Sequence, residues 1–119
     1  MGPSKQGDNY AVTFNLGDRK LSMVALEDLG NAAAKIFTQP SYIGQDVFIC
    51  GDQLTIEEVA ADFSKALDIK CVYNKLDNDA YRALGFPGAA ELGNMFQFNH
   101  DFEDFNNKRN VAESKKLVP

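Results

Sequence analysis

The chain has few of the residues on which enzyme active sites usually depend. Its 119 residues include one histidine, His100, and two cysteines, Cys50 and Cys71. No nucleophile, base and orienting group can be recognised as a catalytic triad. The cysteines stand in apolar, strand-like segments, which favours buried free thiols over a disulfide and indicates a reducing compartment. We therefore expect a cytoplasmic protein, and the first ten residues contain no apolar segment typical of a secretory signal.

Dense positive charge and long apolar runs are also missing. The 12 Lys and Arg residues are outnumbered by 17 Asp and Glu residues, which gives a net charge of −5 at pH 7. The basic residues are scattered, whereas binding to nucleic acid phosphates needs them clustered. No apolar run approaches the roughly 20 residues of a membrane span. We expect neither nucleic acid nor a membrane among the partners.

Glycine-rich phosphate-binding loops are absent as well. A dinucleotide site needs the spacing G-x-G-x-x-G between a strand and a helix, and nucleotide-binding P-loops have their own glycine pattern. Neither predicted strand-to-helix turn, in "LSMVALEDLG" and in "CGDQLT", contains such a loop. We therefore expect no cofactor to bind these 119 residues alone.

What the sequence does contain is an alternation of strands and helices typical of an α/β fold. Residues 1–9 are polar and rich in turn-forming residues, so we expect a flexible tail. Residues 10–119 are expected to form a small three-layer-like domain with a short, partly parallel sheet and C-terminal helices. The predicted strands are 10–16, 21–25, 47–50 and 70–76, and the predicted helices are 26–37, 56–67, a short one within 77–85, one from Pro87 or Gly88 onward, and 111–117.

The clearest local pattern is the start of the second helix. Thr55 and Glu58 have the spacing of a capping box, in which each residue satisfies a free backbone group at the helix start. A strand precedes this helix and another follows it, which is the order of a βαβ unit. We therefore predict that strands 47–50 and 70–74 pair in parallel through a right-handed crossover.

Two groups of polar residues are candidates for chemistry. His100 is followed by carboxylates within 101–104, which could suggest a divalent metal site, but a solvated acidic loop is the favoured interpretation. Tyr73 and Lys75 approach the Tyr–Lys spacing of some reductases, yet they stand at the end of a strand and not on a helix. No catalytic residue and no metal ligand is therefore assigned.

The stretch "YRALGFPGAAELGNMFQF" (81–98) combines glycine, aromatic residues and methionine. At helical spacing, Leu92, Met95 and Phe96 would cover one face. Two interpretations remain open: this face pads the core, or part of it is uncovered and contacts a ligand or a second domain. A large exposed apolar patch usually marks an interaction site.

Three segments together resemble one protein family. The segments "LEDLGNAAAKIF", "YIGQDVFICGDQLTIEEVAADFSKAL" and "YRALGFPGAAELGNMFQF" look like the C-terminal part of NmrA-like proteins, which are atypical short-chain dehydrogenase/reductases. The resemblance runs from about residue 10 to 119. It implies a fold in which a large N-terminal Rossmann domain holds NAD(P) and a smaller part closes over a substrate cleft. It also implies that this chain lacks the Rossmann half, whose nucleotide-binding motif falls upstream of Met1.

The resemblance further implies a role for particular residues. The 81–98 region borders the cleft in such proteins, so the expected cleft or interface residues are Tyr81, Phe86, Met95, Phe96 and Phe98. Relatives commonly place an Asp where this chain has Ala25, and the loss of that Asp removes a helix cap typically worth about 1 kcal/mol.

Two functional hypotheses follow from the resemblance. In the favoured one, the chain is a non-catalytic binding or interaction module without a dinucleotide site, although full-length relatives use NADP. In the alternative, it is part of an NAD(P)-dependent oxidoreductase that needs a Rossmann domain supplied elsewhere. The partners expected are a second copy of the chain, in a homodimer built near 86–105, a Rossmann-domain partner or a small apolar ligand.

Overall fold

The computed structural model describes residues 2–104 and 108–118. The described chain divides into two compact units. The first unit comprises residues 2–21 and 54–103, and the second comprises 22–53, 104 and 108–118. Two strands, β3 (Lys20–Met23) and β4 (Asp52–Thr55), pair with each other, and the residues of each are divided between the units.

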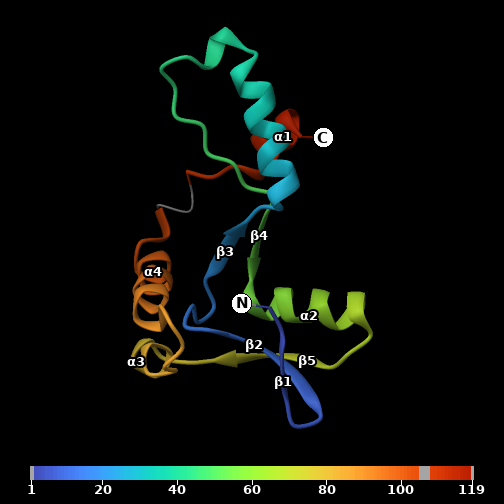
Figure 1. Cartoon of the computed structure of the whole chain (residues 1–119), viewed down its shortest axis with the longest axis vertical. Coiled ribbons are helices and arrows are strands. Elements are labelled where there is room, and N and C mark those ends of the chain that lie inside the picture. Colours follow the sequence, from blue (N-terminus) through green and yellow to red (C-terminus); the bar gives the residue numbers. More distant parts are fainter. Residues whose placement is uncertain (1, 105–107, 119) are drawn as a thin grey trace. The chain divides into compact units, whose positions relative to one another are not determined.

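The first unit is built on a three-stranded mixed sheet with the order β1-β2-β5. Strand β1 (Ser4–Gln6) pairs antiparallel with β2 (Asn9–Phe14), and β2 pairs in parallel with β5 (Cys71–Lys75) (Figure 1). Residues 4–6 are therefore a strand where the sequence predicts a flexible tail. The hairpin becomes possible because Gly7 adopts a positive φ of 61°, which a glycine tolerates without strain.

The predicted strand at 47–50 is wrong. Residues 45–50 form no strand, and β4 begins at Asp52 and pairs with β3. The backbone at 49–50 is bonded to side chains: Arg109 Nη1 donates to the Ile49 carbonyl at 3.1 Å, and the Cys50 N–H donates to Ser114 Oγ at 2.9 Å. The predicted βαβ pairing fails with it, because the parallel partner of β5 is β2 and not residues 47–50.

The predicted helices are confirmed. Two twelve-residue helices, α1 (Leu26–Phe37) and α2 (Ile56–Leu67), are followed by α3 (Asn78–Arg82), α4 (Ala89–Asp101) and α6 (Val111–Leu117), and a 3₁₀ turn, η1 (Pro40–Tyr42), follows α1. The predicted strands 10–16, 21–25 and 70–76 are confirmed as β2, β3 and β5, each shorter than predicted, with β2 and β3 beginning one residue earlier. No helix in the described residues is long and apolar enough to cross a membrane.

The helix starts differ in how they are capped. The Thr55 hydroxyl accepts a hydrogen bond from the Glu58 N–H at 3.3 Å, which confirms the N-cap half of the predicted capping box. The Glu58 carboxylate accepts from the Thr55 hydroxyl at 3.1 Å instead of from the Thr55 backbone. Helix α1 has no such bond, because Ala25 at its N-cap has no side-chain acceptor. Helix α4 begins after Gly88, whose φ of 86° is accessible mainly to glycine.

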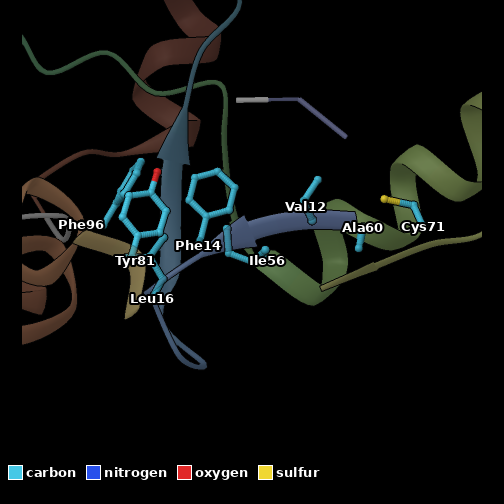
Figure 2. Packing of buried hydrophobic residues seen from close by; sticks show 8 residues of the cluster. All are labelled: Val12, Phe14, Leu16, Ile56, Ala60, Cys71, Tyr81 and Phe96. Carbon is cyan, nitrogen blue, oxygen red and sulfur yellow. The ribbon is translucent and has the colours of Figure 1, made fainter. Parts of the chain in front are cut away.

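The core of the first unit lies between the sheet and three helices. Figure 2 shows the buried cluster, which consists of Val12, Phe14, Leu16, Ile56, Ala60, Cys71, Tyr81 and Phe96. Helix α2 contributes Ile56 and Ala60, while α3 and α4 contribute one aromatic residue each. The rings of Phe14 and Phe96 meet edge to face with centroids 4.9 Å apart, a geometry that aromatic pairs prefer.

The second unit buries far less. Its buried residues among those described are Ala32, Cys50, Ser114 and Leu117. Leu26 and Phe37, at the two ends of α1, are 85% and 89% exposed. Cys50 here and Cys71 in the first unit are both buried free thiols, as the sequence predicts.

Candidate ligand-binding site

The connection between α3 and α4 positions three of the predicted site residues. Gly85 and Gly88 both adopt positive φ, which turns the chain sharply between the two helices. As a result the Tyr81 ring stands edge to face with both Phe86 and Phe96, with centroids 6.0 and 5.8 Å away. Tyr81 is only 2% exposed, so its ring is fixed between its two neighbours.

A cavity of about 220 Å³ lies beside this aromatic group. It is lined by Gly2, Ser4, Thr13, Tyr81, Leu84 and Phe86. The walls come from β1, β2, α3 and the α3–α4 connection, all within the first unit. Since an apolar cavity of about 150 Å³ accepts benzene, this volume is enough for one ring with a short substituent.

Tyr81 brings an unused hydrogen-bonding group to this site. Its hydroxyl has no hydrogen-bond partner among the described residues, although the residue is almost completely buried. Burial raises the pKa of Tyr81 because it disfavours the charged phenolate. The hydroxyl therefore remains protonated at neutral pH and is able to donate a hydrogen bond.

The remaining predicted site residues lie elsewhere. Phe96 is part of the core, with 1% of its surface exposed. Met95 and Phe98 are on the outer surface of α4, and the Phe98 ring packs at 4.9 Å against that of Phe102. The structure thus brings Tyr81, Phe86 and Phe96 together and leaves Met95 and Phe98 outside the cavity.

Sequence reasoning missed four residues of the cavity wall: Gly2, Ser4, Thr13 and Leu84. Leu84 lies two residues before Phe86 in the same connection, so its proximity could have been expected. Thr13 comes from β2, and only the tertiary arrangement of the first unit brings it near α3.

Hydrogen bonds from Arg82 hold α3 and α4 together behind the site. Its guanidinium donates to Asn94 at 2.8 Å and to Asp79 at 3.1 Å, and also to Gln97. The two helices approach closely at Gly93, where an added Cβ would lie 2.9 Å from Arg82 Cγ. A glycine at this position therefore permits the contact.

Asn15 ties the end of β2 to both helices. Its amide group is buried and donates to Asn78 Oδ1 at 2.8 Å and to the Gly93 carbonyl at 3.0 Å. The side-chain oxygen of Asn15 is buried without a partner, which normally costs stability. Both amide hydrogens are thus used to position α3 and α4.

The polar candidates from the sequence are engaged in local contacts. His100 Nδ1 lies 2.9 Å from Asp101 Oδ1, and Glu103 pairs with Arg19. Within residues 2–104 and 108–118, no three His, Cys, Asp or Glu side chains are placed to share a metal ion. The hydrogen bond from His100 is the main cause of a lowered pKa at Asp101.

Tyr73 and Lys75 are also held by structural contacts. The Lys75 ammonium forms an ion pair with Asp18 at 2.9 Å and lies 5.7 Å from the centre of the Tyr73 ring. The hydrogen bond between Lys75 and Asp18 is the main cause of a lowered pKa at Asp18 and a raised pKa at Lys75. The Tyr73 hydroxyl faces the Phe14 carbonyl at 3.5 Å.

Comparison with known proteins defines the class to which this fold belongs. The sequence profile of the NmrA-like family matches residues 2–119, and the chain belongs to this family. Solved structures with a similar fold include a reductase, a quinone oxidoreductase and an epimerase. They include the Citrobacter sp. triphenylmethane reductase complexed with NADP(H), at 18% identity, a TM-score of 0.73 and 91% of this chain covered.

Two further structures support the same fold. The NADPH-dependent quinone oxidoreductase of Escherichia coli, complexed with NADPH, is 21% identical with a TM-score of 0.62 over 92% of this chain. A nucleoside-diphosphate-sugar epimerase from Staphylococcus aureus is 17% identical with a TM-score of 0.68 over 76%. The chain spans only 39%, 36% and 34% of the lengths of the reductase, the oxidoreductase and the epimerase. At these identities the likeness establishes the fold and not a shared substrate.

Proposed function

We propose that these residues form the ligand-binding part of an NmrA-like protein and carry no catalytic step of their own. The observation that carries the proposal is the cavity beside Tyr81 and Phe86, whose lining is mainly apolar and includes Tyr81, whose hydroxyl has no partner among the described residues. Pockets for small molecules typically combine apolar walls with a few placed polar groups. The ligand class this fits is a small, mainly apolar ring compound that accepts a hydrogen bond.

The nucleotide, in this proposal, is bound by residues outside the chain. The 119 residues contain no glycine-rich loop, while two of the solved relatives, each more than twice as long, are complexed with NADP(H) or NADPH. The exposed apolar residues of α1 offer a surface on which a Rossmann-type domain would pack. In the alternative hypothesis the assembled pair is an NAD(P)-dependent oxidoreductase, and this chain is its substrate side.

A ligand titration with matched variants tests the cavity. Acetophenone carries an aromatic ring and a carbonyl acceptor, and ethylbenzene has nearly the same shape without the acceptor. We expect saturable binding of acetophenone by NMR or calorimetry, and weaker binding of ethylbenzene. Phe86→Ala should weaken acetophenone binding, while Phe98→Ala, at a similarly exposed position outside the cavity, should not. Equal effects of the two variants would refute the site.

Titration with NADPH on the same sample tests the rest of the proposal. We expect no heat of binding, and light scattering on that sample measures whether the chain forms the predicted homodimer. Saturable NADPH binding would overturn the proposal that residues outside the chain bind the nucleotide, since it would require a phosphate site without a glycine-rich loop. The acetophenone titration tests the cavity and the NADPH titration tests the absence of a nucleotide site, so either part of the proposal can be refuted without the other.

A further inference from the structure

The second unit contains a larger cavity, of about 430 Å³, that the proposed function does not use. It lies among the start of α1, residues 49–51 and helix α6, and Figure 1 shows the C-terminal helix beside α1. Its apolar walls include Val24, Ile49 and Val118. None of the residues predicted from the sequence as a site lies here.

Hydrogen bonds fix the walls of this cavity. The buried Ser114 hydroxyl donates to the Asn110 carbonyl at 2.9 Å and accepts from the Cys50 N–H at 2.9 Å. On the other side, the Gly51 N–H donates to the Met23 carbonyl at 2.7 Å. Segment 49–51 is thereby joined to α6 and to β3, so the cavity does not depend on a mobile loop. A preformed site binds with less loss of conformational entropy.

Two opposite charges line the same cavity without pairing. The Asp28 carboxylate comes from the first turn of α1 and the Lys115 ammonium from α6. Neither forms an ion pair or hydrogen bond with any residue that the structure describes, including each other. The neighbouring Lys116, in contrast, is paired with Glu113 at 2.8 Å and does not line the cavity.

We infer that this cavity binds a free α-amino acid with an apolar side chain. The carboxylate of such a ligand pairs with Lys115, its ammonium pairs with Asp28, and its side chain occupies the apolar walls. A ligand with a negative charge alone would meet the Asp28 carboxylate, and one with a positive charge alone would meet Lys115. An uncharged apolar ligand would pair with neither charge. A zwitterion offers an oppositely charged partner to both side chains at once.

A matched series of phenyl compounds tests this inference on the whole chain. L-phenylalanine carries both charges, 3-phenylpropionate carries only the carboxylate, and 2-phenylethylamine carries only the ammonium. Calorimetric titration should give a dissociation constant below about 1 mM for L-phenylalanine. Each singly charged analogue should bind at least about tenfold more weakly, and glycine, which lacks the apolar group, should also bind more weakly.

Charge-removing variants assign the binding to this cavity. Asp28→Asn and Lys115→Gln should each weaken L-phenylalanine binding about tenfold or more. The matched controls are Glu27→Gln and Lys116→Gln, since these charges are adjacent in the chain but do not line the cavity. All four positions are exposed, so the variants should keep the wild-type circular dichroism spectrum.

The outcomes separate clearly. Selective binding of L-phenylalanine, lost in the two cavity variants and kept in the two controls, supports the inference. Absence of L-phenylalanine binding to the folded chain overturns it, as does equal binding of 3-phenylpropionate or equal loss in Lys115→Gln and Lys116→Gln. The inference is independent of the acetophenone experiment, because the two cavities share no residue.

Discussion

The two units use helices of the same length in opposite ways. Helices α1 and α2 both have twelve residues and an apolar face. Helix α2 covers its face by packing Ile56 and Ala60 against the sheet of the first unit. Helix α1 packs chiefly against the short elements η1 and α6 of its own unit, and its terminal residues Leu26 and Phe37 stay exposed.

The difference shows that an amphipathic helix does not bury its apolar face by itself. An apolar stripe becomes part of a core only where a sheet or another helix is available to receive it. In the first unit β2 and β5 supply that surface, whereas in the second unit no described element does so for the ends of α1. The apolar residues Leu26 and Phe37 are therefore left largely uncovered by the residues that the structure describes.

The strongest test of this comparison removes one aromatic ring from each unit. Phe96→Ala should lower the free energy of unfolding by about 3–5 kcal/mol, because it leaves a cavity against Phe14 and Tyr81. Phe37→Ala should change it by less than about 0.5 kcal/mol, since that side chain is exposed. Urea denaturation of both variants measures the difference. A large loss from Phe37→Ala would show that the α1 surface is covered, for example in a homodimer.

A second test concerns Asn15, whose buried side chain connects the end of β2 to α3 and α4 in the first unit. Asn15→Ala should cost about 1–3 kcal/mol, because it removes the hydrogen bonds that connect β2 to α3 and α4. Asn74→Ala is the matched control, since Asn74 is less buried and its side chain donates, among the described residues, to Thr13 Oγ1 at 3.3 Å. Its expected cost is smaller, and denaturation under the same conditions compares them. Equal costs would mean that the two helices are positioned by packing and not by Asn15.

How far the sequence could predict this structure depends on the range of the interactions. The Thr55–Glu58 cap of α2 was predictable, since both partners lie within one helical turn. Strand 47–50 was mispredicted, because its apolar composition matches a strand while its backbone bonds go to side chains at 109 and 114. Sequence patterns do not contain contacts over sixty residues. Parallel pairing was expected, but the choice of β2 as partner was not.

The candidate sites also differ in how far the sequence could predict them. Tyr81 and Phe86 were predicted from a family resemblance, and the structure brings them together at one cavity. Phe96 was expected at the same site but belongs to the core, because residues in one helical turn point to different sides. The Asp28–Lys115 cavity had no sequence signal, since its residues come from three separated segments.

The two long helices also differ at their N-termini, which gives a smaller but two-sided test. Thr55→Ala should destabilise the chain by about 1 kcal/mol, because it removes the hydroxyl that accepts from Glu58. Ala25→Asp should stabilise α1 by a similar amount, since residue 25 already has the extended backbone of an N-cap and no side-chain acceptor. Thermal denaturation measures both. A loss of stability in Ala25→Asp would contradict the absence of a cap at α1.

The smallest expected effect concerns the hydroxyl of Tyr81 at alkaline pH. Burial raises the pKa of Tyr81 above its ordinary value near 10, so the unfolded chain releases this proton at a lower pH than the folded chain. The corresponding stability is complete below pH 10 and is lost as the pH rises through the folded pKa. Tyr81→Phe should therefore match the wild type at pH 7 and lose less stability than the wild type near pH 11.

Urea denaturation of both proteins at the two pH values measures this difference. Tyr73, whose pKa is also raised chiefly by burial, remains in the variant and keeps part of the alkaline loss. Near-equality at pH 7 is expected because the Tyr81 hydroxyl has no partner among the described residues. A clear loss of stability in Tyr81→Phe at pH 7 would instead reveal a hydrogen bond from that hydroxyl. The group would then be unavailable to a ligand, and the case for the first cavity would rest on its apolar walls alone.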